Sequence, residues 1–102
     1  MICEIVRFAV KPGTTRDQVV ADARTVVERW QGEKDLVRKH FLFDGEKEAL
    51  GIYFWHNREA AVAAHDQTWR QRVFDTHGSV PEIEYHDTVM IVDNTDGSVT
   101  EY

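Results

Sequence analysis

The chain has 102 residues, of which 42% are hydrophobic and 29% are charged, and its formal net charge is −6. This is the composition of an ordinary globular protein, and the length predicts one domain over residues 1–102. The negative balance, without any basic run, disfavours binding to nucleic acid or to an anionic membrane. The N-terminal stretch lacks the features of a signal peptide, and no run approaches the roughly 18 apolar residues of a membrane span. We therefore expect a cytoplasmic protein.

The first half of the chain predicts two strands and one helix. Residues 2–10, ICEIVRFAV, alternate as a strand does, and a Lys-Pro-Gly sequence ends it. Thr15 stands three residues before Gln18, which is the spacing of a capping box, so a helix is predicted over about 16–30. The second strand is predicted over 35–44, and the Asp-Gly that follows it indicates a hairpin.

The second half predicts a strand, a helix and a strand. The stretch 50–56, LGIYFWH, is apolar on both alternations, which predicts a strand covered on both faces. Asn57 follows at the N-cap position of a helix. The inward stripe predicted for this helix consists of Val62, His65, Trp69 and Val73. The last strand is predicted over about 82–92, and the polar tail 93–102 is either a short extra strand or an arm that reaches a partner.

The order strand, helix, strand, strand, helix, strand predicts an α+β fold of the ferredoxin-like βαββαβ type. Right-handed crossovers place both helices on one face of a four-stranded antiparallel sheet. The strands are apolar on both alternations, and a large open apolar face rarely stays in water. A second copy of the chain is the simplest cover, so we expect a homodimer in which two sheets pack face to face.

His65 is the leading catalytic candidate because it shares the predicted inward stripe with Trp69. Burial disfavours the charged imidazolium and leaves a neutral ring that can accept a proton. Tyr53, on the preceding strand, can donate a hydrogen bond to a substrate oxygen. The aromatic residues expected to wall a substrate pocket are Trp55, Trp69, Phe74, Phe8 and Phe41. The alternative is a filled core in which His65 bonds a backbone carbonyl, and the residues alone leave both interpretations open.

Four further features of the sequence bear on chemistry. Glu4 shares a strand face with apolar residues, so it is either paired or open to solvent near the end of the sheet. The alternation of Glu82, Glu84 and His86 is typical of a solvated edge strand rather than of a divalent-metal site. Cys3 is the one cysteine, and its place in an apolar strand indicates a buried hydrophobic side chain. The histidines show no zinc-binding spacing, so we expect no metal.

The run IYFWHNREAAVAAH resembles the strand-to-helix segment of the dimeric α/β-barrel superfamily, which includes the antibiotic-biosynthesis-type monooxygenases. The positions that carry the resemblance are Trp55, Asn57, Glu59, Ala60 and His65. The closing stretch VPEIEYHDTVMIVDN resembles the end of the YdhR-like monooxygenases through Pro81, Asp93 and Asn94, and the opening VRFAVKPG is similar to the same group.

The resemblance implies a homodimer with one pocket per subunit, which oxidises a phenolic or quinone-like molecule with O₂ and needs no metal or flavin cofactor. It implies His65 as the base, Tyr53 as the donor to the substrate oxyanion, and Trp55 with Trp69 as walls. Other members of the superfamily cyclise or isomerise polyketides with a Tyr/His pair. A dimer that binds a small molecule without catalysis is the third possibility.

The haem-degrading members of the superfamily are poorly matched. Val6 stands where they carry a polar Asn, and Phe74 falls near the place of their axial His, although His77 lies three residues further on.

Overall fold

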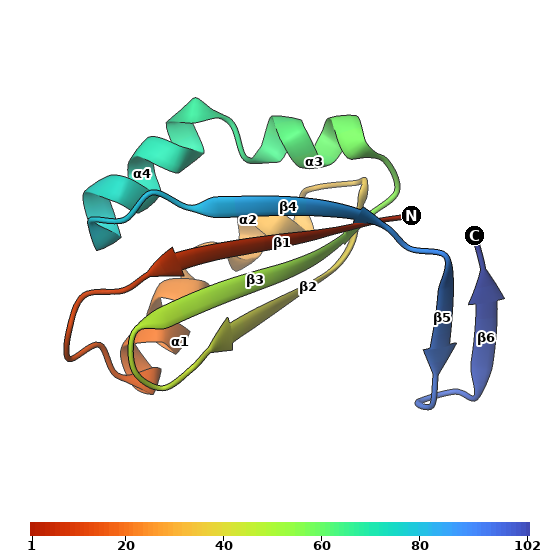
Figure 1. The fold of residues 1–102 in the computed structure, drawn as a ribbon, viewed down its shortest axis with the longest axis horizontal. Helices are drawn as coiled ribbons and strands as arrows, with labels where there is room; N and C mark the ends of the chain where they lie inside the picture. Colours follow the sequence, from red (N-terminus) through yellow and green to blue (C-terminus); the bar gives the residue numbers. More distant parts are fainter.

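The computed structural model describes residues 1–102 and confirms the α+β, ferredoxin-like fold predicted from the order of the elements. The main sheet has four antiparallel strands in the order β2-β3-β1-β4 (Figure 1). β1 and β3 are the two central strands because each strand–helix–strand connection crosses over right-handedly and leaves room for one strand between the two that it joins. None of the helices is long and apolar enough to cross a membrane. The elements are β1 (Ile2–Ala9), α1 (Arg16–Arg24), α2 (Val27–Gln31), β2 (Leu36–Phe43), β3 (Glu48–Trp55), α3 (Arg58–Ala64), α4 (Gln67–His77), β4 (Glu82–Asp87), β5 (Met90–Asp93) and β6 (Ser98–Glu101).

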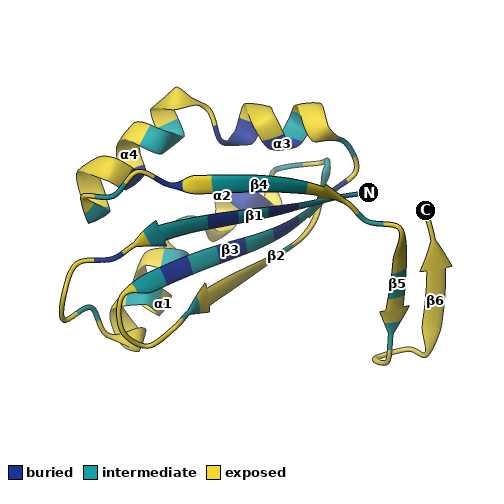
Figure 2. Ribbon diagram, viewed as in Figure 1, coloured by how far each residue is buried: buried dark blue, intermediate teal, exposed yellow.

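The core lies between the helices and one face of the main sheet. Because side chains alternate along a strand, the register of β1 with β3 fixes which residues share this face. Figure 2 shows the buried residues concentrated along β1 and β3 and on the helices that face them. The central cluster consists of Val6, Trp30, Tyr53, Trp55, Ala61 and Ala64.

The first predicted helix is divided into two. The capping box is confirmed, since the Gln18 backbone N–H donates to Thr15 Oγ1 at 3.2 Å and the Thr15 N–H donates to Gln18 Oε1 at 2.8 Å. However, α1 ends at Arg24, so the prediction of a continuous helix over 16–30 was wrong. Thr25 donates its hydroxyl to the Asp22 carbonyl at 2.6 Å, a local bond that competes with helix continuation.

The second predicted helix is also divided, at His65 and Asp66. Asn57 caps α3 as predicted, but the Asp66 side chain accepts a hydrogen bond from the Trp69 backbone N–H at 2.9 Å and begins α4. The two segments therefore have separate inward faces. The prediction of one inward stripe was wrong for Val62, which is 49% exposed.

The last predicted strand is shorter than expected. β4 ends at Asp87, and the next backbone N–H, that of Thr88, bonds to the carbonyl of Met1. The chain then leaves the sheet, and β5 pairs with β6 as a separate hairpin that projects from the end of the main sheet (Figure 1). The prediction of one strand over 82–92 was therefore wrong in its second half, and the polar tail contributes the extra strand β6.

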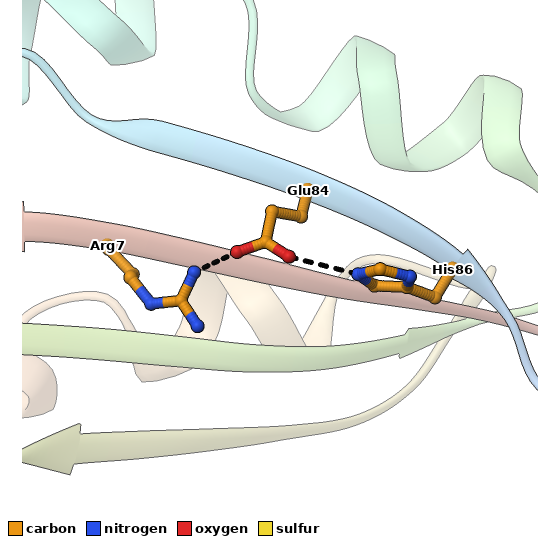
Figure 3. Close-up of polar contacts among 3 residues, drawn as sticks. All are labelled: Arg7, Glu84 and His86. Carbon is orange, nitrogen blue, oxygen red and sulfur yellow. Dashed lines mark hydrogen bonds and ion pairs between the residues drawn. The ribbon is translucent and has the colours of Figure 1, made fainter.

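The second face of the main sheet has no helix over it. The apolar side chains on this face, by register, are Cys3, Ile5, Leu42, Leu50, Ile52 and Phe54. Toward the β4 edge the same face carries charge. Arg7 of β1 forms an ion pair with Glu84 of β4, and His86 Nε2 lies 3.0 Å from the other carboxylate oxygen of Glu84 (Figure 3). Glu84 is therefore already engaged by two side chains.

Candidate functional site

A carboxylate and an imidazole meet inside the core. Glu4 of β1 is 0% exposed and His65, at the end of α3, is 2% exposed. His65 Nδ1 lies 2.8 Å from Glu4 Oε2, and the Trp55 indole N–H donates to Glu4 Oε1 at 2.9 Å. Of the two interpretations of Glu4, the solvent-exposed one is wrong and the paired one is confirmed. A buried carboxylate requires such partners because its desolvation is otherwise very costly.

The Glu4–His65 pair is incompletely satisfied. The contact between Nδ1 and Oε2 has the distance of an ion pair but not the geometry of a hydrogen bond, and Nε2 of His65 has no hydrogen-bond partner in the chain. A buried polar atom without a partner is costly and is most often found where a water or a ligand completes the site.

Three aromatic rings enclose His65. Its ring centroid lies 4.4 Å from that of Trp69 and 4.7 Å from that of Tyr53, both edge to face, and 5.5 Å from that of Trp30. The predicted proximity of His65, Trp69 and Tyr53 is thus confirmed. Edge-to-face packing of this kind fixes ring orientation as well as burying area.

A cavity of about 230 Å³ lies beside this cluster, between the sheet and the helices α1, α2 and α4. It is large enough for a small planar ligand rather than for an extended polycycle. Apolar side chains predominate in its walls, and its aromatic side chains, histidine aside, are Phe8, Trp30, Phe41, Tyr53 and Trp69.

Some of the predicted site residues line the cavity, and the others lie outside its lining. Tyr53, Trp69, Phe8 and Phe41 line the cavity. His65 does not line it. It lies behind the wall formed by Trp30, Tyr53 and Trp69, each of which touches both the cavity and the imidazole.

The remaining two predicted wall residues are not in the cavity lining. Trp55 is fully buried and stacks on Tyr53 with an interplanar angle of 13°. Phe74 is 47% exposed and lies away from the cavity. The division of the predicted helix at Asp66 accounts for Phe74, because the face that α4 turns inward carries Trp69 and Val73.

Tyr53 is the one predicted catalytic residue that faces the cavity directly. Burial, and then the negative charge of Glu4, raise the pKa of its phenol above the ordinary value, so the hydroxyl is a proton donor at neutral pH. Its ring lies over Gly51, where an added Cβ would approach Tyr53 Cε1 to 2.6 Å. The missing side chain at residue 51 therefore provides the space that the phenol ring occupies.

Lys39 is a cavity residue that the sequence interpretation missed. It lies opposite Tyr53 in the register of β2 with β3, and its Nζ is 3.8 Å from the ring centroid of Phe41, 4.4 Å from that of Trp30 and 4.6 Å from that of Tyr53. The signal that would have found it is the alternation of Lys39, Phe41 and Phe43 along one strand face.

The amine of Lys39 is electrostatically unusual. Burial, and then the positive charge of Arg29, lower its pKa from 10.5 to about 7, against the opposing effect of Glu4. No carboxylate lies within ion-pair distance of Lys39. Arg29 also lines the cavity, with its Nη2 donating to the Ala64 carbonyl at 2.7 Å and its Cζ lying 4.3 Å from the Trp30 centroid. The chain contains no cluster of three or more His, Cys, Asp or Glu side chains arranged to hold a metal ion.

The chain matches no protein-family model, and no curated protein matches it. The fold is that of the α+β, ferredoxin-like class.

Proposed function

We propose that the protein is a cofactor-independent monooxygenase that oxidises a small phenolic or quinone-like aromatic molecule in the cavity. The observation that supports this most directly is the position of Tyr53, which belongs both to the cavity wall and to the shell around the Glu4–His65 pair. Of the three rings that touch both the cavity and the buried imidazole, Tyr53 is the one that carries a hydroxyl. The resemblance to antibiotic-biosynthesis-type and YdhR-like monooxygenases favours the same chemistry.

Each step of this oxygenation can be assigned to side chains of the cavity or of the buried pair. A bound phenol loses its proton, and the resulting electron-rich anion reduces O₂, so that one oxygen atom enters the product as a carbonyl and the other leaves as water. The Tyr53 hydroxyl donates to the substrate oxyanion, and the positive charges of Lys39 and Arg29 favour the anionic form. The aromatic walls exclude water from the anion. His65, paired with Glu4, is the final acceptor of the proton. Because His65 has no direct contact with the cavity and no hydrogen-bond partner in the chain, the transfer requires a bridging water.

The test compares candidate hydroxyaromatic substrates under air and under argon. The proposal expects product only with oxygen, one ¹⁸O atom per product molecule from ¹⁸O₂, and loss of turnover in Tyr53→Phe. Tyr102→Phe is the control, since Tyr102 is exposed and does not line the cavity. Equal conversion under argon contradicts the oxygenase proposal and indicates a cofactor-free cyclase or isomerase.

The position of His65 behind the wall favours a second candidate, a protein that binds a small molecule without transforming it. In that case, the ligand is recovered unchanged, and His65→Gln retains binding while Trp69→Ala in the cavity wall weakens it. Isothermal titration with recovery of the ligand separates this candidate from an enzyme.

We further propose that the helix-free face of the sheet is the contact between two copies of the chain. Ile5, Ile52 and Phe54 are partly buried at its centre, and a second copy related by a two-fold axis presents the same apolar surface. Sedimentation should show a dimer for the wild type and a monomer for Ile52→Lys. Val62→Lys, on the exposed side of α3, serves as the control and should stay dimeric. A monomeric wild type at about 100 µM, well above the Kd of a stable dimer, rejects this assembly.

A further inference from the structure

The proposed oxygenation uses Lys39 only as a positive charge, yet the cavity places its amine away from any carboxylate and over aromatic ring faces, which attract an ammonium only by cation–π interaction. Nζ lies within 4.6 Å of the ring centroids of Phe41, Trp30 and Tyr53. No carboxylate contacts it, although Asp22 lines another part of the cavity. A lysine in a surface ion pair is held as an ammonium, whereas this lysine has no such partner.

The charged groups around Lys39 come from each packed element. The positive charge of Arg29 on α2 has the largest effect of any charged group on the pKa of Lys39. The negative charge of Glu4 on β1 has a smaller, opposite effect, and Tyr53 of β3 is neutral. On the far side of the cavity, α4 contributes Arg72 and His77. The balance lowers the pKa of the amine to about 7, so that roughly half of the molecules carry a free amine at neutral pH.

We propose that Lys39 is a nucleophilic amine that holds aldehyde- or ketone-bearing planar aromatic ligands in the cavity as reversible imines. Desolvation in an apolar pocket next to a second cation is an established way of activating a lysine for this reaction. The proposal shares the cavity with the oxygenation proposed above but does not depend on that reaction.

The chemistry needs no oxidant or reductant. The lone pair of the neutral amine attacks the carbonyl carbon, a C–N bond forms, and the carbonyl oxygen takes up a proton to become a hydroxyl group. That hydroxyl leaves as water with a proton from the nitrogen, which gives a C=N bond, so amine and carbonyl yield imine and water. Tyr53, directly across the β2–β3 ladder from Lys39, is the hydroxyl placed to donate to the carbonyl oxygen.

The experiment incubates the full chain under argon with 2-naphthaldehyde, a planar aromatic aldehyde, and reduces the mixture with cyanoborohydride. Intact mass should show one addition, and peptide mapping should place it on Lys39. At pH 7 we expect labelling of Lys39 at least about tenfold faster than that of the exposed Lys47, because an ordinary lysine is almost wholly protonated there. Labelling of Lys39 should rise through pH about 7 and level off, while Lys47 continues to gain up to about pH 10.

Two controls make the result decisive. Lys39→Arg keeps the charge and a long stem and should lose the rapid labelling, whereas Lys47→Arg should keep it. In the wild type, naphthalene, which has the same ring and no carbonyl, should slow labelling of Lys39 but not of Lys47 or of the Met1 amine. Labelling that is spread over the lysines and Met1 according to exposure, or that naphthalene does not slow, overturns the proposal. Because oxygen is absent throughout, failure here is distinct from failure of the oxygenase assay.

Discussion

Replacing Lys39 with methionine tests the electrostatics of the cavity without ligand or partner. The methionine keeps an unbranched side chain in the aromatic wall and removes the cation. Burial, with a further contribution from Arg29, lowers the pKa of Lys39 from 10.5 to about 7 in the folded protein. Between these two pH values, the unfolded chain binds a proton that the folded protein has released. The free energy of unfolding of the wild type therefore rises with pH across this window.

The magnitude follows from the pKa values. Each pKa unit corresponds to about 1.4 kcal/mol, so the full lowering corresponds to about 5 kcal/mol. Lys39 is only partly buried, so solvent screening reduces the expected change to about 2–4 kcal/mol. Below pH 7 Lys39 is charged in both the folded and the unfolded state, so the folded wild type carries the full cost of burying the ammonium group. Lys39→Met should therefore be more stable than the wild type at pH 6, and this electrostatic advantage should vanish as the pH approaches 10.5.

Urea unfolding of both proteins at a series of pH values from about 6 to about 10.5 provides the assay. Subtracting the unfolding free energy of the wild type from that of Lys39→Met cancels the contributions of other groups that titrate in this pH range. One such group is Cys3, whose pKa is raised by burial. Lys47→Met, at an exposed position, should differ from the wild type by a constant small amount at every pH. A difference between Lys39→Met and the wild type that stays constant from pH 7 to 10.5 refutes the reasoning.

Three further predictions concern stability, each measured by chemical denaturation. Gly51→Ala should destabilise the fold by about 1–3 kcal/mol, because the new Cβ meets the Tyr53 ring at 2.6 Å, and Tyr53→Ala in the same chain should remove most of this cost. Glu4→Leu should destabilise the fold by about 3–5 kcal/mol, because it leaves the buried His65 without its carboxylate partner. Glu4→Gln still offers an acceptor to Trp55 and should cost clearly less. Equal losses of stability in the two variants would contradict the pairing. Thr15→Ala should cost about 1 kcal/mol through loss of the α1 cap, and an unchanged midpoint would show that the capping box contributes nothing.

The sequence alone determined the features that depend on neighbouring residues. The capping box at Thr15 and Gln18, the cap at Asn57 and the alternation along β1 and β3 all involve residues a few positions apart, so their signals are local. Together they fix the order of elements, and the right-handed crossover rule turns that order into the sheet topology. The second cap at Asp66 was also present in the sequence, but the longer apolar pattern obscured it and joined two helices into one.

The tertiary structure decided which residues form the site. Glu4, Trp55 and His65 come from three elements, and nothing local to any of them predicts that they pair. The same holds for Lys39, whose free amine depends on rings and charges from α2, β1 and β3. β4 likewise extends only as far as its register with β1, which ends at the pair Ile2 and Asp87. Local sequence sets caps and periodicity, whereas burial and electrostatics arise only when distant segments exclude water together.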